Sequence, residues 1–300
     1  MNAPRFIFIS LWLLLLFALG IVLGGTRVTR VSTNTAPSAT SPVYSSELHT
    51  KEFFDHAYEV ADGRPTPGIQ SLLVAHHLLV ADAMAEDFED AVSNEVKTVV
   101  IVSPNHFGVG PSPAQVTFGE YVTPYGNVQS DSVVAQKLIA VYPKLVHSEA
   151  AFSNEHGIYA LTPFVKKSFP NAKIIPIILY DSLPATEAYQ LGQTIAEQLP
   201  DALLIASVDM THYQPADYTA ANDAKVLQRI SDSWLCDGTV CVDNLDIDSN
   251  SSMRVLFGFN SARGATSFQL TRHDSSLGLG ATGDYHENTS HILGYFTTAK

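Results

Sequence analysis

Along most of this chain, short runs of apolar, often β-branched residues alternate with longer segments in which apolar residues recur every three or four positions. The short runs predict strands and the longer segments predict helices. The predicted strands are Ser71–Ala75, Thr98–Val102, a short pair at Val116–Phe118 and Tyr121–Thr123, Lys173–Leu179, Ala202–Ser207 and Ser290–Thr297. The predicted helices are Leu79–Asp90, Ser130–Val141, Gly157–Ser168, Ala185–Leu199, Ala216–Asp232 and Met253–Gly264. This alternation predicts a single α/β domain with a mainly parallel central sheet and helices on both faces.

Prolines and capping residues mark where some of these elements begin or bend. Pro163 must lie near the start of its helix or kink it, because proline clashes with the preceding turn. Pro176 interrupts the run KIIPIIL and predicts an edge strand or a bulge, because proline has no backbone N–H to donate. Ser130 or Asp131 is the predicted N-cap of the helix that follows it.

The first 44 residues differ in composition from this domain. Phe6–Gly25 contains no charged residue, and at about 1.5 Å per residue a helix of this length crosses a hydrocarbon core of about 30 Å. It is longer than the core of an ordinary signal peptide, so residues 1–25 are predicted to be an uncleaved transmembrane signal-anchor. Residues 26–44 are rich in Ser, Thr and Pro and predict a disordered stalk, and residues 45–300 form the predicted α/β domain.

The net charge of the chain restricts its partners. A formal net charge of −13 argues against nucleic acid and against adhesion to an anionic membrane surface. Membrane contact is therefore predicted only through the N-terminal helix, with the globular domain outside the cytoplasm. The sequence carries no information on the oligomeric state.

The two cysteines leave three alternatives open. Cys236 and Cys241 are separated by Asp237-Gly238-Thr239-Val240, and the Asp-Gly pair marks a turn that would bring them together. They could form a disulfide closing a small loop, remain two thiols, or belong to a metal site. A disulfide would suit an oxidising compartment.

Histidines follow three of the predicted strands directly. Ser71–Ala75 ends at His76 and His77, Thr98–Val102 leads to His106, and Ala202–Ser207 leads to Asp209 and His212. Loops at the carboxyl ends of parallel strands converge on one crevice, so these side chains are expected to meet in space. Imidazole is the commonest metal ligand and the usual proton shuttle near neutral pH. The sequence therefore predicts one site with metal or acid–base chemistry.

Four motifs in a fixed order extend this interpretation. They are Ser103-Pro104-Asn105-His106-Phe107-Gly108, Tyr121-Val122-Thr123-Pro124-Tyr125-Gly126, Asn154-Glu155-His156-Gly157-Ile158 and Ser207-Val208-Asp209-Met210-Thr211-His212-Tyr213. Together they resemble the Memo family, the protein B component of the AmmeMemoRadiSam system, from about Ser71 to the C-terminus. The fold of that family is similar to that of class III extradiol ring-cleaving dioxygenases, which use non-haem iron(II).

The resemblance implies roles for six residues. His76 and His106 correspond to two metal ligands proposed in relatives, and the implied ion is iron or copper in preference to zinc. His212 corresponds to an acid–base histidine, and Asp209 lies where it could fix the imidazole tautomer. Glu155 and His156 form a second carboxylate–imidazole pair expected to line the same cavity. For Glu155 the alternative is a carboxylate that interacts with a helix dipole; for His77 a packing or rim position is expected.

One departure from the family pattern leaves the function open. Relatives carry a Cys-Gly pair near the start of their late helix, and this chain is expected to have Ser251-Ser252-Met253-Arg254 there. The third metal ligand is then missing, supplied by Asp209, Glu155 or His212, or the site holds no metal. One hypothesis is a metal-dependent redox or dioxygenase-like enzyme; the alternative is a non-catalytic protein that binds a metal, a small molecule or a peptide in the retained pocket.

Overall fold

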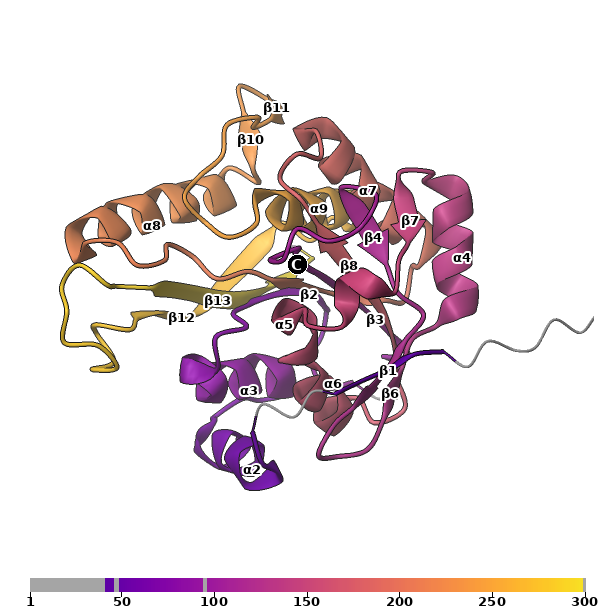
Figure 1. The fold of residues 1–300 in the computed structure, drawn as a ribbon. Helices are drawn as coiled ribbons and strands as arrows, with labels where there is room; N and C mark the ends of the chain where they lie inside the picture. The colour runs from indigo at the N-terminus through magenta and orange to yellow at the C-terminus, as the bar shows by residue number, and fades with distance from the viewer. Residues whose placement is uncertain (1–40, 46–48, 94–95, 299–300) are drawn as a thin grey trace, which may run out of the picture. The chain divides into compact units, whose positions relative to one another are not determined.

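An eight-stranded mixed sheet organises the chain. The computed structural model describes residues 41–45, 49–93 and 96–298. The strand order is β12-β13-β2-β9-β3-β8-β4-β7, and β2, β9, β3 and β8 at its centre are mutually parallel (Figure 1). The bounds are Ile69–Val74 (β2), Thr98–Pro104 (β3), Ala114–Val116 (β4), Leu145–His147 (β7), Lys173–Leu179 (β8), Leu203–Ser207 (β9), Ser267–Ser275 (β12) and Ser290–Thr297 (β13).

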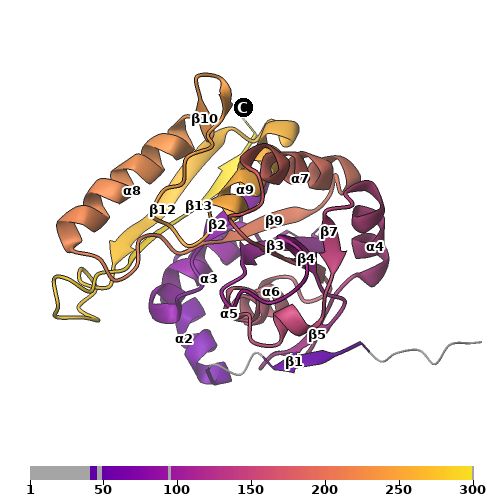
Figure 2. The same ribbon diagram turned by 45° about the horizontal axis from the view of Figure 1, so that its top comes forward.

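Helices cover both faces of this sheet and enclose two apolar cores (Figure 2). One face carries α4 (Ser132–Val141), α7 (Ala185–Gln198), α8 (Ala216–Ser231) and α9 (Asn250–Arg263). The other carries α2 (Lys51–Val60), α3 (Ala81–Asp90), α5 (His156–Tyr159) and α6 (Thr162–Ser168). Neighbouring residues of the central strands point to opposite cores, as Leu72 and Leu73 do, because side chains alternate along a strand. The predicted α/β fold with helices on both faces is therefore confirmed.

The remaining described elements are short. A small sheet contains β1 (Val43–Ser45), β5 (Glu120–Val122) and β6 (Val128–Gln129), and a hairpin contains β10 (Leu235–Cys236) and β11 (Thr239–Val240). Two 3₁₀ turns are η1 (Leu78–Val80) and η2 (Ala150–Phe152). Cys236 and Cys241 form a disulfide at this hairpin, with Cα atoms 5.0 Å apart, which is the first of the three alternatives.

Helices α7 and α9 pack closely against each other. A Cβ atom at Gly192 would lie 2.0 Å from the carbonyl oxygen of Val255, and one at Gly258 would lie 1.9 Å from that of Tyr189. Glycine at both positions thus allows the two helix backbones to approach each other closely. Helix α9 starts at Asn250, earlier than predicted, and ends at Gly264 with the left-handed φ of 64° that favours glycine.

Several local predictions were wrong for physical reasons. Pro176 is not on an edge strand, because β8 lies between β3 and β4. However, β4 pairs only with Ile177–Leu179, so the missing N–H of Pro176 removes no hydrogen bond between β8 and β4. The segments Val116–Phe118 and Tyr121–Thr123 do not pair with each other, since β4 joins the large sheet and β5 the small one. The helix predicted over Gly157–Ser168 is two helices, and Pro163 lies in the first turn of the second.

The predictions of a transmembrane helix, a membrane partner and a membrane-anchored, extracytoplasmic protein are contradicted. Within the ranges that the structure describes, no helix combines the length and the apolar character needed to cross a membrane. Phe6–Gly25 and residues 26–40 of the predicted stalk lie outside the described residues. At the end of the predicted stalk, Val43–Ser45 form β1, which pairs with β5.

Candidate metal centre at the carboxyl edge of the sheet

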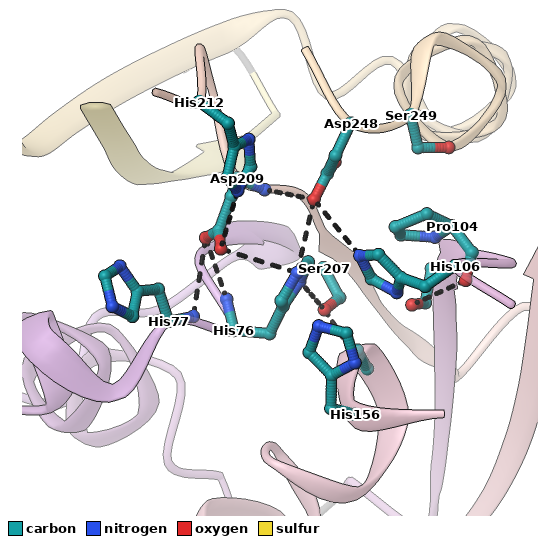
Figure 3. Close-up of polar contacts among 12 residues, drawn as sticks. His76, His77, Pro104, His106, His156, Ser207, Asp209, His212, Asp248 and Ser249 are labelled. Carbon is teal, nitrogen blue, oxygen red and sulfur yellow. Dashed lines mark hydrogen bonds and ion pairs between the residues drawn. The ribbon is translucent and has the colours of Figure 1, made fainter. Parts of the chain in front are cut away.

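The three strand-end segments meet at the carboxyl edge of the sheet, as their positions predicted. His76 follows β2, His106 follows β3 and Asp209 follows β9. The ring centroids of His76 and His106 are 5.0 Å apart. Asp209 Oδ2 lies 3.4 Å from His76 Nε2 and 3.8 Å from His212 Nε2, so the acid links the first and last histidines of the group. Figure 3 shows the side chains pointing toward one another from these separate segments.

Hydrogen bonds orient the buried ring of His76. Its Nδ1 lies 3.0 Å from Ser207 Oγ, and Ser207 donates its own hydroxyl hydrogen to the Gly157 carbonyl at 2.6 Å. Ser207 Oγ therefore accepts from Nδ1–H, and Nε2 is the nitrogen that faces the centre of the site. Burial by itself would lower the pKa of His76, but the nearby carboxylates Asp209 and Asp248 raise it above its usual value.

His106 is oriented in the same way by Glu155. Its Nδ1 donates to Glu155 Oε1 at 2.6 Å, and its backbone N–H donates to Oε2 at 2.9 Å. Glu155 is fully buried and also accepts from the N–H of Gly157, where it caps α5. A carboxylate behind a histidine ring is the usual partner of a metal-ligating imidazole, because it fixes the ring and raises its basicity. Burial opposes protonation, but Asp248 and Glu155 raise the pKa of His106 to about 9.

His156 lies against both of these rings. Its ring stacks on His106 with centroids 4.0 Å apart and meets the ring of His76 edge-on at 5.2 Å. Burial and the two neighbouring imidazoles lower the pKa of His156 to about 4, so it is neutral at pH 7. The next residue must be small, because a Cβ atom at Gly157 would lie 2.0 Å from Ser103 Oγ.

The Asp209 carboxylate accepts backbone hydrogen bonds and interacts electrostatically with the surrounding histidines. Its Oδ1 accepts the backbone N–H of His76 at 3.1 Å and that of His77 at 3.4 Å. Burial opposes ionisation, but the histidines around it, His76 first, hold the pKa of Asp209 far below its usual range. His212 is about a third exposed, and its pKa is raised because Asp209 outweighs the effect of burial.

Asp248 is a site residue that the sequence analysis missed. Its Oδ2 lies 3.2 Å from His76 Nε2 and 3.8 Å from His106 Nε2, and Figure 3 shows it between the two rings. It immediately precedes Ser249, the N-cap of α9. The signal that could have identified Asp248 was the position, near the start of the late helix, where relatives carry a cysteine. The helix was predicted to start three residues too late, so this position was assigned to the wrong residues.

These side chains line one cavity of about 1240 Å³. Five of the six predicted site residues border it, namely His76, His106, His156, Asp209 and His212, whereas Glu155 lies behind His106. His77 borders it too, and its Nδ1 is 3.0 Å from Nε2 of the buried His291. Its lining also includes the apolar or aromatic side chains of Phe53, Leu78, Leu79, Tyr159 and Tyr213.

The donor atoms at the base of the cavity fit a metal ion. Two overlapping groups, His76 with His106 and His156, and His76 with Asp209 and Asp248, each place their ligand atoms within 4.8 Å of one another. Ligands about 2.1 Å from an ion lie about 3 Å or more from each other, close to the observed spacings around Asp248 Oδ2. Asp248 Oδ1 is also buried and has no hydrogen-bond partner among the described residues, so this carboxylate keeps one oxygen without a protein donor.

Comparison with known proteins establishes the family. The sequence profile of the Memo-like protein family matches residues 51–297, so the chain belongs to this family. It is 31% identical to a MEMO1 family protein of Caldivirga maquilingensis over 186 residues. The aligned segment covers 60% of this chain and 66% of that protein. A MEMO1 family protein of Pyrobaculum aerophilum is 34% identical over 44% of this chain and 48% of its own. A MEMO1 family protein of Methanothermobacter thermautotrophicus is 27% identical over 76% of this chain and 83% of its own length.

A solved structure supports the fold alone. An uncharacterized protein of Escherichia coli K12 superposes with a TM-score of 0.51 over 75% of this chain and 99% of its own, at 14% sequence identity. The predicted family and fold class are thus both confirmed.

Proposed function

We propose that this Memo-like protein is a metal-dependent redox or dioxygenase-like enzyme whose ion is held by His76 and His106. The observation that carries the proposal is the convergence of their two Nε2 atoms beside carboxylate oxygen, while each Nδ1 is engaged by Ser207 or Glu155. Rings fixed in this way need little rearrangement to bind an ion. When bound, a divalent iron or copper ion would supply one-electron and Lewis-acid chemistry, and two imidazoles with one carboxylate suit iron(II).

The neighbouring residues have the properties that acid–base chemistry needs. His212 borders the cavity and is partly exposed, so its imidazole can exchange a proton with a bound molecule. Asp209 holds His212 from behind and stabilises its cationic form. Neutral His156 offers a ring nitrogen that can accept a hydrogen bond, and Glu155 keeps His106 in place.

The cavity suits a small molecule or a side chain of a peptide. Its volume of about 1240 Å³ exceeds what one ion and a few waters require and lies near the upper end of ligand pockets. Its lining combines titratable groups with apolar side chains, so it suits a molecule that has both a polar and an apolar part.

Oxygen consumption tests the proposal. Protein reconstituted with iron(II) without oxygen is mixed with a panel of catechols and then with air-saturated buffer, and dissolved oxygen is followed with an electrode. We expect consumption that depends on both metal and catechol, and a loss of at least tenfold in His212→Gln with iron content unchanged. Iron binding without consumption by any catechol would contradict the dioxygenase-like activity and favour the non-catalytic binding protein.

A further inference from the structure

We propose that the carboxylate of Asp248 is the third protein ligand of this centre, in the place that cysteine takes in relatives, and that it makes the site selective for hard divalent ions over copper(I). This inference rests on the proposed metal site at His76 and His106. It concerns which atom completes the ligand set and what that atom selects.

The two carboxylate oxygens of Asp248 have different surroundings. Asp248 Oδ2 lies 3.2 Å from His76 Nε2 and 3.8 Å from His106 Nε2, so it is close to both predicted ligands at once. Asp248 Oδ1 is buried without a hydrogen-bond partner among the described residues. A buried carboxylate oxygen left unpaired costs free energy comparable to a lost charged hydrogen bond, and coordination of an ion would remove that cost.

The other acids that the sequence left open as third ligand are already engaged in other contacts. Asp209 Oδ1 is occupied by two backbone N–H groups, and Oδ2 lies between His76 and His212. Glu155 uses both oxygens to hold His106 and the start of α5. Each of these acids already uses both of its oxygens to orient a histidine or a loop. Asp248 accepts a backbone N–H at Oδ2 alone, from Asp209 at 3.0 Å.

The chain fixes Asp248 from both sides. Its backbone N–H donates to the Asp209 carbonyl at 3.2 Å. On the helix side, Asp181 accepts the N–H groups of Asn250 and Ser251 at 3.1 and 2.7 Å. On the loop side, the buried guanidinium of Arg254 donates to backbone carbonyls of residues 241–243. A ligand held on such a scaffold loses little conformational entropy when an ion binds.

This placement corrects the expected position of the family cysteine. Ser252 and Met253, expected in that place, are fully buried within α9 and do not border the cavity. The hydroxyl of Ser252 bonds to Ser249 Oγ at 2.8 Å. A cysteine at either position would therefore not reach the ion, whereas Asp248-Ser249 stands directly before the first turn of the helix.

Exchanging a thiolate for a carboxylate changes which metals bind well. Soft sulfur ligands select copper(I), whereas carboxylate oxygen suits harder divalent ions, and two histidines with one carboxylate and open positions suit iron(II). We therefore expect the wild type to bind iron(II) and cobalt(II) and to discriminate against copper(I). Thiol-modifying reagents should leave its metal binding unchanged, since both cysteines are in the disulfide.

Metal titrations of four full-length proteins test this inference. Wild type, Asp248→Asn, Asp248→Cys and Asp209→Asn are titrated with iron(II), cobalt(II) and copper(I) without oxygen, and circular dichroism confirms folding. We expect Asp248→Asn to weaken cobalt(II) binding by about 100-fold. Asp209→Asn, which keeps an oxygen for the two N–H groups, should weaken it by about tenfold, the lower end of the range for a residue that acts through a ligand. Asp248→Cys should gain copper(I) affinity and show a near-ultraviolet cobalt–thiolate absorption that the wild type lacks.

The outcomes separate the two proposals. If the wild type binds metal and Asp248→Asn binds it equally well, or Asp248→Cys gains neither the absorption nor copper(I) affinity, Asp248 is not a ligand. The proposed function would then stand with another ligand. If the wild type binds none of the three metals at micromolar concentration, the proposed function itself fails.

Discussion

Replacing Glu155 by glutamine separates the orientation of His106 from general stability. The glutamine side chain would keep one oxygen to accept His106 Nδ1–H, but its amide NH₂ would face the backbone N–H of His106, which now donates to Oε2 at 2.9 Å. Two donors would then meet in a fully buried position. A buried donor without an acceptor costs about 1–3 kcal/mol of the free energy of unfolding. The ring loses its charged partner, which typically weakens metal binding by about 10–100-fold.

A second carboxylate provides a matched control. Glu149 also accepts one backbone N–H, from Phe118 at 3.0 Å, and one imidazole, from His147 at 2.6 Å, but it does not border the cavity. Chemical unfolding of the metal-free proteins and cobalt(II) titrations of the folded ones compare Glu155→Gln with Glu149→Gln. We expect both to lose stability, and only Glu155→Gln to lose metal affinity. Equal metal affinities in Glu155→Gln and the wild type would refute the role of Glu155 as the support of a ligand.

Three further predictions concern stability and proton transfer. Burial raises the pKa of Asp87 well above its usual value, so the folded protein holds a proton there that the unfolded chain releases, and stability falls as pH rises between the two pKa values. Asp87→Asn keeps the acceptor for Thr271. Thermal unfolding should show it to be more stable than the wild type at pH 7 but not near pH 3. An equal difference in stability at the two pH values would contradict this. Replacing Cys236 and Cys241 together by serine opens a short loop and should cost about 2 kcal/mol in denaturant unfolding, and a cost near zero would show that the hairpin does not need the bond. His212→Gln should retain cobalt(II) affinity within about threefold of the wild type, because Asp209 stands between His212 and His76; a loss as large as that of His106→Ala would make His212 a ligand.

The sequence was sufficient for the parts of the fold that depend on local pattern. The strand Lys173–Leu179 and the strand Ser290–Thr297 were predicted with their observed bounds, because uninterrupted apolar runs mark strands buried on both faces. Strand β12 escaped detection because it lies at the edge and its residues are mostly polar and half-exposed. The interior position of Pro176 was equally hidden, since it depends on how far a strand from elsewhere in the chain extends its pairing.

The site divides in the same way. His76, His106 and Asp209 could be predicted to meet because each follows a central parallel strand. Asp248 follows no strand and reaches the centre because α9 packs on α7 and Asp181 accepts two N–H groups of the first turn of α9. Such a contact depends on tertiary packing and leaves no periodic signal along the chain.

The metal content of the wild type and of His106→Ala tests the central claim most directly. Both proteins are reconstituted with iron(II) without oxygen, passed through a desalting column and analysed for metal and protein. We predict about one iron per wild-type chain and nearly none in His106→Ala, because one imidazole and a carboxylate do not retain the ion. Equal iron contents in two folded proteins would contradict the assignment of His76 and His106 as the core of the metal centre.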